Sequence, residues 1–140
     1  MLLLLHFMAS SIMVGVIWVI QLVHYPSFNY IEKQRYSNFQ SFHMTRISYV
    51  VIPVMLIELL TLVLLIYSMD QINIELVLSG IILLLIWVIT AIFFSGAHQK
   101  LTLGYDKSVV GNLIQMNWSR TLLWTFRLIL LVSCLSLIHI

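Results

Sequence analysis

The chain has 140 residues, of which 61% are hydrophobic and 9% charged, and its formal net charge is +2. Soluble domains carry about 25% charged residues, so this composition leaves too little polar surface to coat a water-soluble globule. The length suits one domain, and we expect a single membrane domain over residues 1–140 with the lipid bilayer as its solvent.

Four apolar runs have the roughly 20-residue length that crosses a hydrocarbon layer of about 30 Å. The first lacks the basic start of a signal peptide, so we expect it to be retained. Because lipid offers no partner to backbone groups, each run is expected to be a helix. In chain order the expected spans are Leu2–Val23, Ile47–Ser68, Leu76–Ala97 and Thr121–Ile140. The predicted fold class is therefore all-α, a four-transmembrane-helix bundle.

The connections between the spans differ in length and charge. The second and third spans are joined by a short turn with Asp70 and Glu75, whereas the other two connections are long, and each is expected to hold a short interfacial helix. All seven basic residues lie in or beside the long connections: Lys33, Arg35, Arg46, Lys100, Lys107, Arg120 and Arg127. The positive-inside rule then predicts a multi-pass inner-membrane protein with cytoplasmic linkers and both termini outside.

An internal repeat relates the two halves, roughly residues 1–70 and 75–140. After a shift of 74 positions (98 minus 24), His24 falls on His98, and "HMTR" at 43–46 falls on "NWSR" at 117–120. Each half crosses the bilayer twice, so the halves have the same orientation. The sequence therefore predicts two similar helical hairpins, a parallel internal repeat about an axis along the membrane normal.

Three histidines are expected near the inner face. His24 and His98 end the first and third spans at matched depth, and His43 lies just before the second span. Neutral imidazoles suit transition metals such as iron and copper, so His24, His43 and His98 are candidate metal ligands. The alternative is a set of interfacial histidines that bond to lipid headgroups or carbonyls.

A carboxylate, Glu58, lies well inside the second span. It follows Arg46 by 12 residues, which is about 18 Å along a helix, so it should face the bundle interior with a partner or a proton. Its 15-residue separation from His43 leaves about 60° of rotation, so the two residues share a helix face. We expect Glu58, His43 and Arg46 to form a catalytic set, with a plain interhelical hydrogen bond as the alternative for Glu58.

Five further residues are candidates for cofactor binding. His6, toward the outer end of the first span, is either a packing residue or an axial haem ligand. Arg120 and Arg127 either anchor phosphates or present a guanidinium fork to a carboxylate or propionate. Gln21 and Trp18 share a face of the first span and either line the same cavity or pack.

Short motifs give the chain a resemblance to small bacterial four-helix membrane proteins. "LHFMASSIMVG", "QLVHYP" and "RISYVVIPVM" resemble the HemJ-type protoporphyrinogen oxidases. A set of uncharacterised membrane proteins shares the signatures His24-Tyr25-Pro26, His43 to Arg46, Pro53 to Glu58 and Asn117 to Thr121. The oxidase resemblance implies haem b, oxidation of a porphyrinogen, and His6 as the histidine of helix one. In place of that family's Asn-Glu-Pro-like segment, this chain has "MNWSRT".

These observations favour a haem- or metal-dependent redox enzyme that acts on a hydrophobic or tetrapyrrole-like substrate. One alternative is a non-catalytic accessory subunit that binds lipid or quinone, and another is a small proton-coupled carrier. The dispersed basic residues exclude a nucleic-acid surface. We expect a homo-oligomer or an association with a larger membrane complex.

The predicted topology is testable at Ser108 in the second long linker. A Ser108→Cys variant is expected to resist a membrane-impermeant thiol reagent in intact cells, because the linker faces the cytoplasm. Labelling of that cysteine without lysis would contradict the orientation.

Overall fold

The computed structural model describes residues 1–68 and 73–138, so Asp70 and the last two residues of the fourth expected span lie outside the described residues. Within these two ranges every regular element is helical. The α-helices are α1 (Leu2–Val19), α2 (Tyr25–Ser27), α3 (Tyr36–Ser68), α4 (Ile74–Ile89), α5 (Ser95–Thr102) and α6 (Lys107–Ile138). The remaining elements are two π-helical turns, η1 (Ile20–His24) and η4 (Thr90–Phe94), and two 3₁₀ turns, η2 (Phe28–Tyr30) and η3 (Lys33–Arg35).

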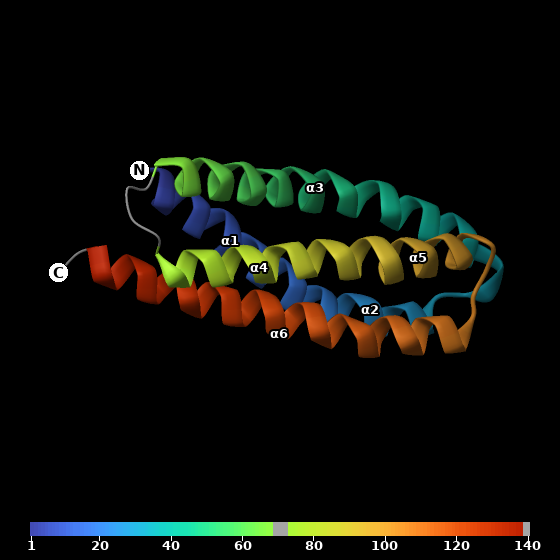
Figure 1. Ribbon diagram of the computed structural model, residues 1–140. Helices are drawn as coiled ribbons and strands as arrows, with labels where there is room; N and C mark the ends of the chain where they lie inside the picture. Colours follow the sequence, from blue (N-terminus) through green and yellow to red (C-terminus); the bar gives the residue numbers. More distant parts are fainter. Residues whose placement is uncertain (69–72, 139–140) are drawn as a thin grey trace.

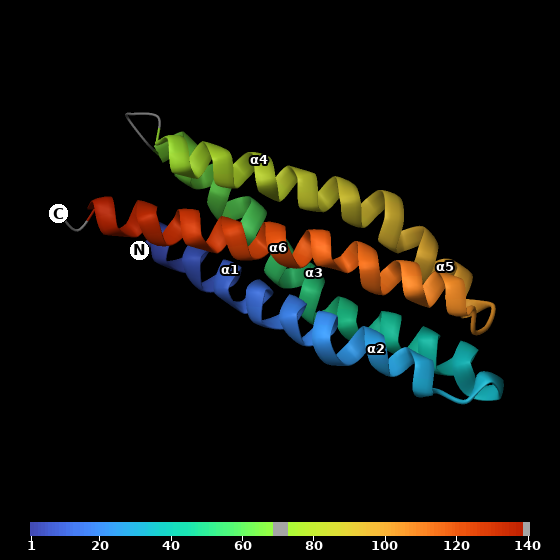
Figure 2. The same ribbon diagram turned by 90° about the horizontal axis from the view of Figure 1, so that it is seen from below.

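Four helical stretches are long and apolar enough to cross a membrane: Leu2–Tyr30, Lys33–Ser68, Ile74–Thr102 and Lys107–Leu135. The predicted all-α class and the four span-like helices are therefore confirmed. The stretches lie side by side, with the two linkers at one end of the bundle and the starts of α1 and α4 at the other (Figure 1 and Figure 2). In such a bundle the backbone groups in the interior of each span find partners within their own helix, as a lipid environment requires.

The linkers differ from the expectation of separate interfacial helices. Residues 36–46 are the first turns of α3, which runs unbroken for 33 residues, and residues 107–120 are the first turns of α6. The chain from Tyr36 to Arg46 contains no Pro or Gly, so nothing stops the helix before the span begins. At 1.5 Å per residue α3 is about 50 Å long and extends beyond a hydrocarbon layer of about 30 Å.

The second linker turns sharply between α5 and α6. Gly104 has φ +144°, a backbone conformation that side chains disfavour, and its N–H donates to the Leu101 carbonyl at 3.3 Å. Asp106 then caps α6, because its Oδ1 accepts from the Ser108 hydroxyl at 2.7 Å and from the Ser108 N–H at 2.8 Å. These hydrogen bonds, the Ser108 hydroxyl first, lower the pKa of Asp106 below its ordinary value.

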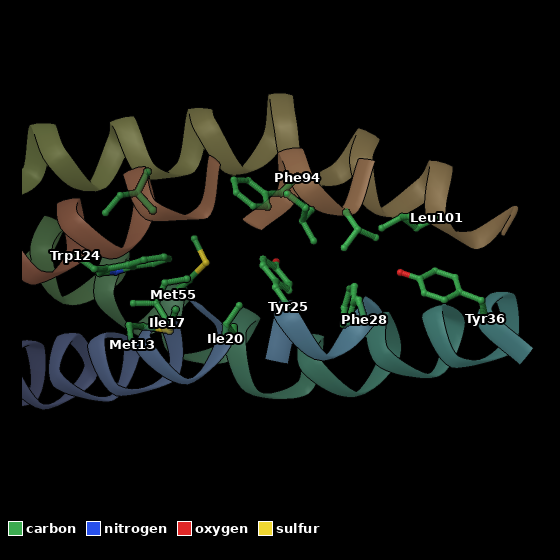
Figure 3. Packing of buried hydrophobic residues seen from close by; sticks show 13 residues of the cluster. Met13, Ile17, Ile20, Tyr25, Phe28, Tyr36, Met55, Phe94, Leu101 and Trp124 are labelled. Carbon is green, nitrogen blue, oxygen red and sulfur yellow. The ribbon is translucent and has the colours of Figure 1, made fainter. Parts of the chain in front are cut away.

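The apolar core follows the long axis of the bundle. α1 packs against both α3 and α6, α4 packs on α6, and α3 contacts α5 near the linker end. Buried side chains run from Trp124 past Met55 and Tyr25 to Tyr36 (Figure 3). Tyr25 therefore lies inside the core and faces Phe94 across the bundle, with 6.4 Å between ring centroids.

Backbone strain at the second linker gives a stability prediction. Gly104→Ala is expected to lower the free energy of unfolding by roughly 1–2 kcal/mol, because an L side chain is disfavoured at this φ. Gly111→Ala is the control, since Gly111 lies within α6 and an added Cβ meets nothing within 4 Å. Thermal unfolding of both variants in detergent measures the difference, and equal melting temperatures would contradict the prediction.

Candidate functional site

Two π-helical turns lie in the first and third long helical stretches, toward the linker end of the bundle. η1 ends at His24, directly before Tyr25, and η4 ends at Phe94, four positions before His98. Single π turns inside α-helices are rare and frequently mark functional sites. Here they lie beside Tyr25 and His98, two of the side chains described next.

The structure brings the three predicted histidines together. His24 Nε2 lies 2.7 Å from His43 Nδ1, and the ring centroids of His43 and His98 are 5.4 Å apart. His98 Nε2 lies 3.1 Å from the Tyr25 hydroxyl, while its Nδ1 accepts from the Gln40 amide at 2.8 Å. His43 Nε2, by contrast, is buried and has no hydrogen-bond partner.

The three histidines form a hydrogen-bonded cluster with their neighbours. Two of the ring nitrogens face each other, and both nitrogens of His98 contact neighbouring side chains. In residues 1–68 and 73–138 no group of three or more His, Cys, Asp or Glu is arranged to hold a metal ion. The proposed iron or copper site at His24, His43 and His98 stays a prediction.

Arg120 lies beside this cluster and is 6% exposed. Its guanidinium carbon stacks 3.5 Å from the Phe94 ring centroid. Nε and Nη2 donate to Asn117 Oδ1 at 3.0 and 2.5 Å, and Nη2 also contacts the Tyr25 hydroxyl at 3.3 Å. Nη1 has a longer contact with the Thr90 hydroxyl, at 3.4 Å. All of these partners are electrically neutral.

A second polar cluster surrounds Glu58 deeper in the bundle. Glu58 Oε1 forms an ion pair with Arg127, and both side chains are fully buried. The same guanidinium donates to Ser10 Oγ at 3.0 Å, to the Ser79 carbonyl at 3.3 Å and to His6 Nε2 at 2.9 Å. Arg127 of α6 thereby contacts α1, α3 and α4 at once.

Hydrogen bonds also fix the protonation of His6. Its Nε2 accepts from Arg127, so Nδ1 carries the hydrogen and donates to Thr61 Oγ1 at 2.7 Å. The Thr61 hydroxyl donates in turn to the Ile57 carbonyl at 2.6 Å. His6 is therefore in its neutral form, with a hydrogen bond at each ring nitrogen. Its expected role as a haem ligand stays a prediction.

A cavity of about 570 Å³ lies between α3 and the α4–η4 segment. Trp124 connects it to the Glu58 cluster, because the indole lines the cavity and its Nε1 donates to Glu58 Oε2 at 3.3 Å. The polar lining includes Tyr25, His43, His98 and Arg120, and the apolar lining includes Met13, Ile17, Ile47, Val51, Met55 and Trp87. The cavity thus combines a polar end with apolar walls.

The expected catalytic set is divided in the structure. Glu58 pairs with Arg127, while His43 contacts His24. Arg46 is exposed, lies 5.3 Å over the Phe42 ring and lines a separate apolar groove of about 520 Å³ between α1 and α3. The rotation estimate did place Glu58 and His43 inside the bundle, but their partners come from helices distant in sequence.

Gln21 and Trp18 lie outside the cavity lining. Gln21 is buried, accepts from Asn117 Nδ2 at 2.8 Å and donates to the Ile114 carbonyl at 3.2 Å. Trp18 donates to Thr125 Oγ1 at 3.1 Å. Gln21 therefore supports Arg120 indirectly through Asn117, and Trp18 packs between α1 and α6.

Four residues around His43, His98 and Arg120 were not among the predicted site residues: Tyr25, Gln40, Phe94 and Asn117. Three of them had a usable signal. Tyr25 lies in the His24-Tyr25-Pro26 signature, Gln40 lies three residues before His43 on the same helix face, and Asn117 aligns with His43 in the repeat. Phe94 had none, because its importance comes from stacking against a residue of α6.

Comparison of the chain with protein-family models, with curated proteins and with solved structures finds no significant match. The resemblance to the HemJ-type oxidases therefore stays an expectation.

The ion pair gives a stability prediction with an internal control. Arg127→Leu or Glu58→Leu alone is expected to lower the free energy of unfolding by about 3–5 kcal/mol, because each leaves a buried charge unpaired. The double variant is expected to recover most of the loss. Denaturant titration in detergent micelles measures all three variants, and losses that simply add would show that the two side chains act independently.

Proposed function

We propose that this chain is an inner-membrane protein that takes a hydrophobic small molecule from the bilayer into the cavity between α3 and α4–η4. Proton or electron transfer would occur at the polar end of that molecule. The cavity itself carries the proposal, because it lies within a bundle of four span-like helices and has imidazole, phenol and guanidinium groups at one end.

The entrance suits a ligand that arrives through lipid. Ile52 is 53% exposed and Leu56 is 44% exposed on the outside of the bundle, and both also line the cavity. Ala91 on η4 is exposed as well and lines the cavity from the other side. Small-molecule sites are typically apolar pockets of about 300–1,000 Å³ with a few converging polar groups, and this cavity falls in that range.

The polar end supports chemistry as well as binding. Imidazole is the commonest general acid or base in enzymes, and the imidazoles of His43 and His98 line the cavity. The Tyr25 hydroxyl contacts both His98 and Arg120. Within residues 1–68 and 73–138, His43 Nε2 is a buried ring nitrogen that has no hydrogen-bond partner. A general acid or base at this position would act on an oxygen or nitrogen of the bound molecule.

Haem b is a second candidate occupant, and the free nitrogen of His43 favours it. His43 would hold the haem iron and Arg120 would bind a propionate. The haem would supply one-electron oxidation chemistry for a tetrapyrrole-like substrate. The role expected of His6 would then be filled by a histidine of α3.

We also propose that the linkers face the cytoplasm and that the two halves of the chain are similar hairpins. Both linkers lie at one end of the bundle (Figure 1), and the basic residues of the linkers support a cytoplasmic position for that end. Each half contains a helix interrupted by a π turn, followed by one long helix. This pattern supports two hairpins related by an axis along the membrane normal.

A blocked entrance tests the proposed function. Ala91→Trp is expected to weaken binding of decylubiquinone and of haem b by roughly tenfold or more, because an added indole overpacks the mouth of the cavity. Quenching of tryptophan fluorescence in nanodiscs measures both ligands, each variant being referenced to its own ligand-free signal.

Val88→Trp is the matched control. Val88 lies one turn earlier on α4, is 52% exposed and does not line the cavity. It should bind both probes like the unmodified protein. Equal binding by the two tryptophan variants, or no binding by either the variants or the parent, would refute the proposed function.

A further inference from the structure

We infer that the cavity takes an amphipathic anion, whose carboxylate or phosphate binds Arg120 and whose apolar body lies along α3. This inference rests on the proposed function and specifies its ligand. It comes from a difference between two arginines of one helix.

Arg120 and Arg127 are seven residues apart on α6 (127 minus 120), which is about two helical turns. Both are buried, and both point into the bundle. Arg127 has a carboxylate, Glu58, as its counter-ion. For Arg120 the partners are the side chains of Asn117, Tyr25, Thr90 and Phe94, and none of these carries a negative charge.

The acidic side chains of the described residues have other partners or lie at other places in the bundle. Glu32 pairs with Arg35 at 3.6 Å on the surface, and Asp106 caps the start of α6. Glu75 lies in the first turn of α4, at the end of the bundle away from the linkers. Within residues 1–68 and 73–138, no carboxylate forms an ion pair with Arg120.

A buried cation without a counter-ion is expensive in a membrane. Burying a charge costs several kcal/mol unless an opposite charge and good hydrogen bonds offset it, and charged residues in spans usually mark functional sites. The neutral contacts of Arg120 offset part of this cost, as does its stacking on Phe94. The missing negative charge is therefore assigned to a ligand.

The guanidinium is placed so that a ligand in the cavity can reach it. Arg120 lines the cavity, and Phe94 stacks on one face of its guanidinium. Nε and Nη2 already donate to Asn117 and Tyr25, whereas Nη1 has, among the described residues, a single contact of 3.4 Å with the Thr90 hydroxyl. Nη1 is therefore the donor available for a charge-assisted hydrogen bond to a carboxylate or phosphate, and the wall formed by Ile47, Val51 and Met55 suits an acyl chain or a flat ring system.

The experiment compares an acid with its ester in the full-length protein. The probes are 11-(dansylamino)undecanoate and its methyl ester, added to protein in phosphatidylcholine nanodiscs, with energy transfer from Trp87 and Trp124 as the signal. The acid is expected to bind at least about tenfold tighter than the ester, the size of one charge-assisted hydrogen bond.

Arg120→Gln is expected to abolish that preference for the acid. Arg46→Gln removes an arginine at the same end of the bundle that lies outside the cavity, so the preference should survive there. Arg120→Lys keeps the charge without the fork and should give an intermediate ratio. This lysine variant also decides the matter if the glutamine variant does not fold.

A competition experiment distinguishes the two sources of the anion, a phospholipid and a free lipophilic acid. Displacement of the probe by phosphatidylglycerol in the nanodisc identifies a phospholipid phosphate, and its failure to compete identifies a free lipophilic acid. Equal affinity of Arg120→Lys and the parent for acid over ester would overturn the inference, as would equal binding of acid and ester by the parent protein. If Ala91→Trp still weakens the binding of decylubiquinone and haem b in that case, the proposed function stands without the anion. If the parent protein binds none of the four probes, the proposed function and the inference both fail.

Discussion

The ion pair between Glu58 and Arg127 is the constraint on which the rest of the bundle depends. Helices in lipid gain little from burying apolar surface against each other, so packing and polar contacts decide how they associate. Arg127 makes such contacts to three other helices through Glu58, Ser10, Ser79 and His6. Once that guanidinium is satisfied, the rotation and depth of all four long helices are set together.

The position of the cavity follows from this arrangement. The ion pair joins the helices in the half of the bundle away from the linkers, and the core continues past Trp124 toward the linkers (Figure 3). Between the two regions, α3 and η4 leave the space of about 570 Å³. Trp124 belongs to both regions, since its ring lines the cavity and its N–H binds Glu58.

Two arginines on one helix then have different roles for a simple electrostatic reason. Arg127 has a negative partner inside the protein, so its charge is balanced and its role is to hold the helices. Arg120 has only neutral partners and lies on the cavity wall, which makes it the group able to bind an anionic ligand. The repeat in the sequence hides this difference, because it aligns Arg120 with Arg46, an exposed residue of another groove.

The sequence by itself determined the setting and the class of fold. Hydrophobic runs of spanning length require helices, because the backbone has no other way to satisfy its hydrogen bonds in lipid. It also indicated that Glu58 has an interior partner, since an ionised acid cannot face acyl chains. The sequence underestimated the lengths of α3 and α6. Hydropathy shows where an apolar run ends, but a helix can continue beyond that point into water.

Only the tertiary structure decided which polar groups meet. The choice of Arg127 for Glu58, the occupation of both nitrogens of His6 and the neutral surroundings of Arg120 all depend on how four helices rotate against one another. The spacing within one helix defines a face, but it carries no information on which face of another helix lies opposite. Contacts between residues more than 60 positions apart, such as those of Arg127 with Glu58 and His6, come from packing alone.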